Sequence, residues 1–499
     1  MPARRTVYAV AFVVGAASLG AEIAAARLLA PWFGASTIVW ANTIATVLVA
    51  LSAGYWLGGR LADRDPSLRG LGRLVLLGAV LLGLVPFVSG PFLRVSVDAL
   101  DRVEAGAAVG SLLAVLVLIA APVLVLGCVA PYAVRLSIGG VDEAGRVAGR
   151  LYAISTLGSL VGTFLAALVL IPLVGTRRTF LTFALALAVV GVLALRRRAA
   201  ALAPLAVAAA LALPVSTVKA TGDGRVIWEA DTEYQYARVV ETDYGERRLE
   251  LNEGLAVHST YRPGRWLTGN YWDEALTLPP AVLGRPPRSI AILGGAAGTV
   301  SRAYGRYFPG TEVEHVEIDG ELTEVGRRLF DLRGPRLRTH ADDARPWLRR
   351  QDRRFEVIYI DAYRQPYIPF YLTTREFFEL VRSRLEPGGA VIVNVGHPEG
   401  SDALEKVMSA TMGAVFRHVA RDPAQDVNTQ LVASDAPIDP DRLRAAARRL
   451  PAELRPAALA TASLLSPALE GGEVWTDDRA PVEWLIDASI VEVAARGER

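Results

Sequence analysis

Glycines and acidic residues follow successive apolar stretches between Ser289 and Asp343 in a pattern suited to holding a nucleoside. Ser289–Asp319 has the pattern of a strand, a glycine turn, a helix and a second strand that ends in acids. Glu317 can accept hydrogen bonds from both ribose hydroxyls, and Asp343 can accept one from the adenine amine. A phosphate-cradling GxGxxG motif is missing, so a nucleoside without a pyrophosphate fits better than NAD. The glycines that let the backbone approach the ligand without a Cβ clash are Gly294, Gly295 and Gly298.

Alternating strands and helices must position these residues. This alternation predicts a parallel, doubly wound, Rossmann-like sheet of the methyltransferase type, in which ligands bind beyond the carboxyl ends of the strands. Upstream, alternating apolar and polar residues in Glu229–Gly254 predict a small antiparallel β unit. The expected strands of the parallel sheet are Ser289–Leu293, Glu312–Glu317, Arg336–His340, Phe355–Ile360 and Ala390–Val395.

The N-terminal part of the chain has the composition of a membrane protein. Hydrophobic residues make up 52% of the 499 residues and the mean hydropathy is +0.31, with the apolar residues concentrated in the first half. A helix needs about 20 apolar residues to cross a bilayer, so six to seven spans are expected. Their windows are Val7–Leu29, Thr37–Gly59, Leu71–Leu93, Ala107–Val129, Leu151–Val174, Thr179–Leu195 and Ala199–Val218.

Arginines between the apolar windows indicate the orientation, because they accumulate in cytoplasmic loops. A seventh complete crossing would place the C-terminal half outside the cell, where nucleoside cosubstrates are scarce. The seventh window is rich in alanine and contains Pro204 and Pro214, so we expect it to be re-entrant or interfacial. The expectation is a multi-pass protein of the cell membrane with a cytoplasmic catalytic part. The expected domains are a transmembrane domain (1–220), a β unit with a connecting helix (221–284) and a Rossmann-like domain (285–499).

Charge and cysteine content exclude other classes of protein. A net charge of +2 gives no reason to expect a nucleic acid partner. The single cysteine, Cys128, excludes an internal disulfide framework and a cysteine-rich metal site. The five histidines show no metal-ligand spacing, so no metal is expected.

The segment Arg353–Val395 contains an apolar strand ending in Asp361, then a loop, Leu372–Phe378 with the residues LTTREFF, and a helix ending in LEPGG. This pattern resembles the spermidine synthase (polyamine aminopropyltransferase) family, of which the chain would be a membrane-fused member. The resemblance covers about 229–432 and a closing motif near Thr476–Glu483. It extends to Glu233-Tyr234-Gln235, to the LxLNxG motif that ends at Gly254, and to Asn270–Glu274.

The resemblance implies an enzyme, a transferase that moves an aminopropyl group from decarboxylated S-adenosylmethionine to an amine or polyamine. The attacking amine must first lose a proton, which requires a carboxylate within reach. Asp361 matches the catalytic acid of the family. Gln235, Glu317 and Asp343 match residues that contact the nucleoside and the sulfonium arm.

Two positions depart from the family pattern. Ala297 replaces an aspartate of the glycine turn, and Arg364 replaces the second acid of the catalytic loop. These changes argue against ordinary putrescine binding, because a cation repels a diamine at short range. The acids that can take over the missing contacts are Asp273, Glu274, Asp477 and Asp478.

Three functions therefore stay open. The first is aminopropyl transfer. The second is methyl or alkyl transfer from S-adenosylmethionine itself, with Arg302 or Arg364 facing its carboxylate. The third is a transporter-like bundle with a nucleoside-sensing domain. Tyr363 belongs to an aromatic loop that is expected either to line an apolar substrate channel or to pack against the membrane part. The expected partners are a small amine and the lipid bilayer, and a homo-oligomer is left open.

Overall fold

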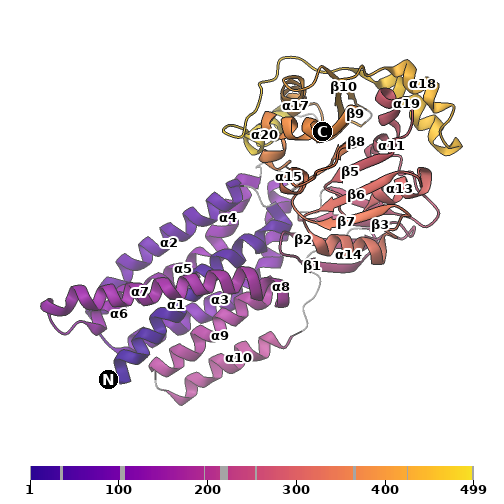
Figure 1. The fold of residues 1–499 in the computed structure, drawn as a ribbon. Helices are drawn as coiled ribbons and strands as arrows, with labels where there is room; N and C mark the ends of the chain where they lie inside the picture. The colour runs from indigo at the N-terminus through magenta and orange to yellow at the C-terminus, as the bar shows by residue number, and fades with distance from the viewer. Residues whose placement is uncertain are drawn as a thin grey trace. The chain divides into compact units, whose positions relative to one another are not determined.

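The computed structural model describes residues 2–33, 37–101, 107–195, 197–213, 223–252, 256–363, 367–423 and 425–496. The chain divides into two compact units (Figure 1). The first contains Met1–Ala220 and Glu229–Ala237, and the second contains Thr221–Trp228 and Arg238–Arg499. The residues 221–284, expected as a separate β unit, are thus shared between the two.

The first unit is a bundle of helices formed by the long apolar runs. Glycines allow two of its helices to touch: a Cβ at Gly158 or Gly162 in α7 would lie 2.1 Å from a backbone oxygen of α1. The helices are α1 (Pro2–Phe33), α2 (Thr37–Arg64), α3 (Leu68–Asp101), α4 (Ala107–Leu118), α5 (Ala120–Gly127), α6 (Val129–Ser137), α7 (Val141–Leu165), α8 (Ile171–Val174), α9 (Thr176–Leu195) and α10 (Leu202–Leu211).

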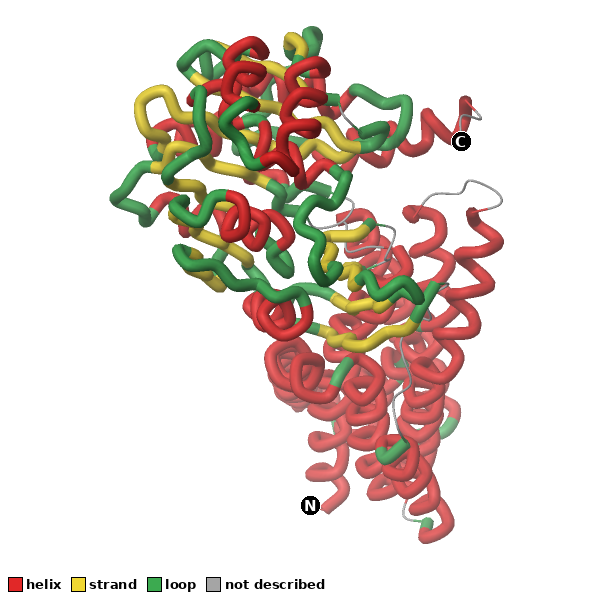
Figure 2. Tube along the Cα trace, turned by 90° about the vertical axis from the view of Figure 1, so that its right-hand side faces the viewer, coloured by secondary structure: helices red, strands yellow, loops and turns green. Residues whose placement is uncertain are grey.

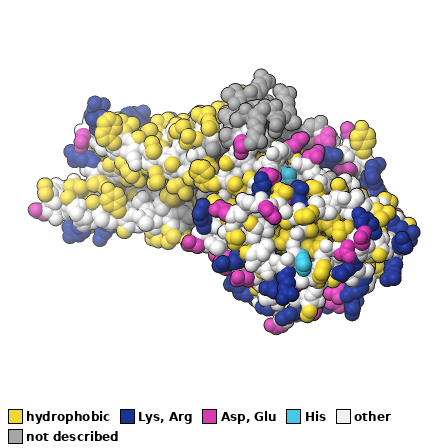
Figure 3. Space-filling view, turned by 90° about the horizontal axis from the view of Figure 1, so that it is seen from above, with side chains coloured by type: hydrophobic (Ala, Val, Ile, Leu, Met, Phe, Trp, Pro, Cys, Tyr) yellow, Lys and Arg dark blue, Asp and Glu magenta, His cyan; other side chains and the backbone are white. Residues whose placement is uncertain are grey.

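Within the described part of the chain, six helical segments are long and apolar enough to cross a membrane. In the space-filling view, hydrophobic side chains cover much of the visible face of these helices (Figure 3). The fourth segment is Ala120–Ser137 and not the expected 107–129, because a helix boundary at Ile119 separates the short helix before it from this segment. The expected seventh window contains only the short helix α10, and its residues 214–218 lie outside the described residues.

A four-stranded sheet precedes the large sheet. Its strands, in their spatial order, are β1 (Arg225–Asp231), β2 (Tyr236–Glu241), β3 (Arg247–Leu251) and β4 (Val257–Tyr261). Strands β3 and β4 pair antiparallel. Figure 2 distinguishes the strands of the protein (yellow) from its helices (red) and its loops and turns (green). Residues 253–255, which include the end of the LxLNxG motif, lie outside the described residues.

The C-terminal unit is built on an eight-stranded sheet of order β12-β10-β11-β9-β8-β5-β6-β7. Strands β7, β6, β5, β8 and β9 are parallel, while β11, β10 and β12 are joined to them by antiparallel pairing. The Rossmann-like fold expected here is confirmed. The strands are β5 (Ser289–Leu293), β6 (Glu312–Glu317), β7 (Leu337–Ala341), β8 (Phe355–Ile360), β9 (Leu385–Gly396), β10 (His418–Asp422), β11 (Asn428–Ser434) and β12 (Ser466–Pro467).

Helices cover both faces of this sheet, and alternate residues of each strand enter different cores. Ile358 and Ile360 of β8 belong to one hydrophobic core, and Val357 and Tyr359 belong to the other. The core around Ile358 includes α15 (Ala344–Arg349), α16 (Arg375–Ser383), α17 (Ala403–Gly413) and α20 (Val482–Arg496). The core around Tyr359 includes α11 (Glu274–Thr277), α12 (Pro279–Leu283), α13 (Thr299–Tyr307), α18 (Pro440–Ala447) and α19 (Arg455–Leu464).

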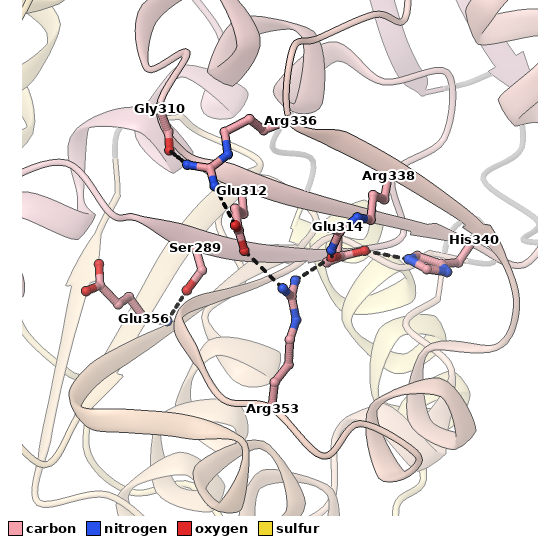
Figure 4. Close-up of polar contacts among 9 residues, drawn as sticks. All are labelled: Ser289, Gly310, Glu312, Glu314, Arg336, Arg338, His340, Arg353 and Glu356. Atoms are coloured by element: carbon pink, nitrogen blue, oxygen red, sulfur yellow. Dashed lines mark hydrogen bonds and ion pairs between the residues drawn. The ribbon is translucent and has the colours of Figure 1, made fainter.

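An ion-pair network joins β6 and β7 to the segment before β8 (Figure 4). The buried carboxylate of Glu314 contacts Arg338 at 3.1 Å, His340 at 2.6 Å and also Arg353. Arg353 also contacts Glu312 at 3.1 Å, so it links two positions of β6. Each buried acid in this network has a basic partner, which is the usual condition for burying a charge.

Candidate functional site

The glycine turn after β5 lies against the beginning of the loop after β8. Gly294 has a φ of +85°, and a Cβ there would lie 2.5 Å from the backbone of Asp361 and Ala362. The Asp361 N–H also donates to the Leu293 oxygen at 2.9 Å. Gly298 has a φ of +93° and begins α13. The structure therefore brings the predicted nucleoside turn and the predicted catalytic acid together.

Two further positions of the turn are crowded. A Cβ at Gly295 would lie 2.2 Å from the ring of His315, so this position also needs glycine. Ala297, which stands where the family has an aspartate, is fully buried, and its N–H donates to the Ser259 hydroxyl at 3.0 Å. The methyl group of Ala297 supplies no charge to this part of the site.

Glu317 is held at the end of β6 by backbone N–H groups of the surrounding turns. Ala296 N donates to one carboxylate oxygen at 2.8 Å, and Asp319 N donates to the other at 3.0 Å. Burial raises the pKa of Glu317 to about 7, against the opposing effect of these N–H groups. Each oxygen has a second lone pair, so the carboxylate can still accept from ribose hydroxyls.

Asp343 follows β7 and caps the N-terminus of α15. One of its oxygens accepts from Arg345 N at 3.0 Å, and the other accepts from the Tyr371 hydroxyl at 2.7 Å. Arg345 in turn forms a two-pronged ion pair with Asp477 at 2.7 and 2.6 Å, and Thr374 donates to the same carboxylate. Asp477 of the closing motif therefore fixes α15 and is not free to bind an amine, as one reading of the sequence expected.

Asp361 is buried at the end of β8. Asn394 Nδ2 donates to one of its oxygens at 2.8 Å, and the Tyr359 hydroxyl lies 3.5 Å from the other. The side chains of Tyr271 and Trp272 lie close enough to lower the pKa of this carboxyl group. Burial has the larger effect and raises the pKa of Asp361 to about 7, although these four neighbours oppose the shift. A carboxyl group that titrates near neutral pH is well suited to accept a proton from an amine.

The aromatic residue Tyr363 is part of this cluster. Its hydroxyl donates to the Asn394 backbone oxygen at 3.1 Å, and Gly396 N contacts the same hydroxyl. The ring therefore braces the loop after β8. Arg364, the next residue and a predicted substrate contact, lies outside the described residues.

The two acids predicted to bind substrate differ in their surroundings. Asp273 accepts from Thr268 N at 3.0 Å and from Gly269 N at 2.8 Å, so its carboxylate caps a loop. Glu274, which begins α11, is only 9% exposed, and its Oε2 has no hydrogen-bond partner. Burial raises the pKa of Glu274 to about 8, and the nearby Asp422 and then Asp273 add to the shift.

Gln235 and Arg302, which were also predicted to contact the ligands, have other surroundings. Gln235 is buried in the turn before β2 and belongs to the helical unit, so its nucleoside contact stays a prediction. Arg302 of α13 is buried, with its guanidinium 4.9 Å from the Tyr261 ring centroid and 4.8 Å from that of Trp266. These cation–π contacts account for its burial.

Sequence reasoning missed three polar residues on the strands that follow β8 across the sheet: Asn394, Gln430 and Asp422. Asn394 had a usable signal, because it ends the apolar run of β9 at the same edge as Asp361. Asp422 and Gln430 lie on β10 and β11, whose antiparallel pairing no sequence pattern announced. Across the described residues, no cluster of three or more His, Cys, Asp or Glu could hold a metal ion.

Known proteins share this C-terminal part of the chain. Residues 271–425 match the spermine/spermidine synthase domain. A probable polyamine aminopropyl transferase of Bifidobacterium longum is 32% identical over 191 residues, which are 38% of this chain and 42% of that protein. A polyamine aminopropyltransferase of Mycobacterium tuberculosis is 30% identical over 296 residues, which are 53% of this chain and 54% of that protein. The chain thus spans about half the length of these relatives.

Among solved structures, a probable spermidine synthase from Corynebacterium glutamicum is 24% identical with a TM-score of 0.40, covering 51% of this chain and 98% of that one. The sequence matches include the strands and loops that carry Asp361, Glu317 and the glycine turn. The C-terminal half of this chain therefore contains a spermine/spermidine synthase domain, which is fused to an N-terminal helical region.

Proposed function

We infer that the C-terminal unit transfers an aminopropyl group from decarboxylated S-adenosylmethionine to an amine acceptor. The observation that carries this proposal is the buried Asp361, with a pKa of about 7, directly against the glycine turn of the nucleoside site. The family match and the names of the relatives support the same chemistry.

In the proposed reaction, the amine nitrogen attacks the methylene carbon attached to the sulfonium. A C–N bond forms, the C–S bond breaks, and methylthioadenosine leaves with the sulfur electron pair. The proton released by the amine goes to Asp361, which Asn394 and Tyr359 hold in place. Because the sulfonium is already an activated leaving group, the protein contributes mainly alignment and proton acceptance.

The donor side of the site is proposed to consist of Gly294, Gly295, Gly298, Glu317 and Asp343. The backbone of the glycine turn would face the nucleoside, with Glu317 at the ribose and Asp343 at the adenine. Gln235 is proposed as a further contact to the nucleoside or its arm. Tyr363 would shape the channel by which the amine reaches Asp361.

A membrane location is proposed for the N-terminal unit. Six candidate spans support it, and many of their large apolar side chains are exposed, for example Val49 at 68% and Leu173 at 76%. Such an apolar surface is typical of helices that face lipid. The proposed topology puts the C-terminal unit in the cytoplasm. Protease added outside right-side-out vesicles should leave this unit intact, and its digestion would contradict the topology.

The donor identifies the reaction. Purified full-length protein in detergent should be given each sulfonium donor together with an amine such as spermidine. Aminopropyl transfer releases methylthioadenosine, whereas methyl transfer from S-adenosylmethionine releases S-adenosylhomocysteine. We expect methylthioadenosine with the decarboxylated donor only. S-Adenosylhomocysteine as the sole product would instead favour methyl transfer, with Arg302 or Arg364 facing the donor carboxylate.

A further inference from the structure

A row of four polar side chains crosses the carboxyl edge of the large sheet beside Asp361. Ile360 pairs with Val393, so Asp361 is adjacent to Asn394 on β9. Asn394 pairs with Gln430 on β11, and Gln430 pairs with Asp422 on β10. Residues paired in register point to the same face of a sheet. The row therefore runs on one face from Asp361 to Asp422.

Hydrogen bonds give this row a direction. Asn394 donates its amide group to Asp361 at 2.8 Å, so its own oxygen is left to accept. Gln430 fills that role by donating its amide group to Asn394 at 2.8 Å. The carbonyl oxygen of Gln430 is consequently turned away from Asp361, and this fully buried atom has no hydrogen-bond partner.

Acids without hydrogen-bond donors lie at the β10 end of the row. Asp422 is fully buried, and neither of its carboxylate oxygens has a hydrogen-bond partner. Glu274 of α11 is close enough to Asp422 for each charge to disfavour the other, and Glu274 Oε2 is also unpartnered. Together with Gln430 Oε1, four buried acceptor oxygens have no donor.

The base next to Asp422 in the sequence, Arg421, forms its ion pair with another acid. Arg421 precedes Asp422 and so points to the opposite face of β10, where it is paired with Glu405 at 2.9 Å. The Thr461 hydroxyl lies beside Asp422 and partly opposes the rise that burial causes in its pKa. The same hydroxyl lies 2.8 Å from that of Thr277, where either hydroxyl can be the donor, so Thr461 offers at most one proton to this set of oxygens. Buried oxygen atoms without hydrogen-bond partners are unfavourable unless a donor binds them. A cationic donor would also neutralise the negative charge of the two carboxylates.

We propose that Glu274, Asp422 and Gln430 form a binding site for a primary ammonium group, the far end of an acceptor whose near nitrogen lies at Asp361. An ammonium carries a positive charge and three N–H donors, which suit this set of oxygens. The inference rests on the proposed aminopropyl transfer. The proposed site also supplies negative charge, which the catalytic loop lacks because Arg364 replaces an acid there.

The position of the acids selects the length of the acceptor. Asp361 and Asp422 are three strand spacings apart, which is about 14 Å at the backbone. An extended chain advances about 1.2 Å per bond, so a four-carbon diamine spans about 6 Å and a triamine such as spermidine about 11 Å. The acceptor class is therefore a linear triamine. Glu274 lies between the two ends of the proposed site, because its charge also acts on Tyr359, the neighbour of Asp361.

The test compares acceptors and variants by release of methylthioadenosine from the full-length protein in detergent. We expect Glu274→Gln and Asp422→Asn each to raise the KM for spermidine roughly tenfold or more, since each loses a charge-assisted hydrogen bond. Butylamine, which lacks the far ammonium, should react equally well with wild type and both variants. Equal losses with both acceptors, or an unchanged KM for spermidine, would overturn the site.

A matched control is Glu405→Gln, which removes a buried acid on the opposite face of the sheet. It should lower the melting temperature without changing the ratio of spermidine to butylamine turnover. A second readout separates this site from the proposed reaction. Spermidine should raise the melting temperature of wild type more than that of Asp422→Asn. If no amine releases methylthioadenosine, the reaction fails, and this thermal shift alone decides whether the ammonium site exists.

Discussion

The amino and carboxyl edges of the large sheet treat buried acids in opposite ways. At the amino edge, Glu314 meets Arg338, His340 and Arg353 (Figure 4). At the carboxyl edge, Glu274 and Asp422 have unpartnered oxygens. Both groups of acids belong to the same folded unit, so burial alone does not decide whether an acid has a basic partner. Paired acids at the amino edge stabilise the unit, whereas unpaired acids at the carboxyl edge leave charge available for a ligand.

The largest expected effect concerns the chemistry at the carboxyl edge. Asp361→Asn keeps the shape of the side chain but cannot accept the proton of the amine. We expect kcat for methylthioadenosine release to fall by roughly 100-fold to 10,000-fold. The control is Asp352→Asn, an exposed acid in the loop before β8, which should keep full activity. Undiminished turnover in Asp361→Asn would remove this residue from its role.

The comparison of the two edges is tested by stability. Glu314→Gln removes the carboxylate that Arg338 and His340 contact and leaves Arg353 with Glu312 alone, so the free energy of unfolding should fall by about 2 kcal/mol. Glu274→Gln removes an uncompensated buried charge, so at pH 8.5 the free energy of unfolding should stay the same or rise. Chemical denaturation of both variants measures this. A loss of the same size in both would show that the edges do not differ.

The next largest effect is the pH dependence of kcat/KM for the amine. Because burial raises the pKa of Asp361 to about 7, the group is protonated and unable to accept a proton below that pH. The value of kcat/KM for the amine should therefore rise about tenfold per pH unit up to about pH 7. Above that pH, Asp361 is ionised and contributes no further rise. A pH profile measured with a donor at saturation checks this, with the residual activity of Asp361→Asn as the baseline. A midpoint near pH 4 would mean that Asp361 is not desolvated.

The smallest effect concerns the closing motif. Asp477→Asn weakens the ion pair to Arg345, and hence the support of Asp343 through α15. Because Asp477 is partly exposed, we expect only about a fivefold rise in the KM for the sulfonium donor, with little change in kcat. The neighbouring Asp478→Asn, at an exposed position, should change neither value. A fall in kcat with an unchanged KM would place Asp477 in the chemistry instead.

The parallel strands were predictable from their apolar runs, and two of these runs lead directly into acids of the candidate site. Glu317 ends one run, and Asp361 follows another. The place of Asp422 was not predictable, since its relation to Asp361 depends on the register of two antiparallel strands, which is decided by tertiary pairing. Asp273 accepts from N–H groups of its own loop, and its contact with the substrate stays a prediction.

The presence of long apolar helices in the N-terminal unit was predictable, but the bounds of each helix were not. Long apolar runs gave the helices, whereas the break at Ile119 moved the fourth candidate span toward Ser137. Pro122 and Pro131 lie in the first turns of the helices that follow the breaks, and a proline lacks the backbone N–H that would continue the preceding helix. The hydropathy of the run does not contain that information.

Trp272 gives the site an optical property of its own. Its side chain is almost fully buried and lies close enough to Asp361 to lower the pKa of that carboxyl group, whose charge must change during the proposed reaction. Indole fluorescence responds to a nearby charge, so the emission of this residue should report proton loss from Asp361 and arrival of a cationic ligand. The protein thereby carries an intrinsic probe for following binding before any bond is made or broken.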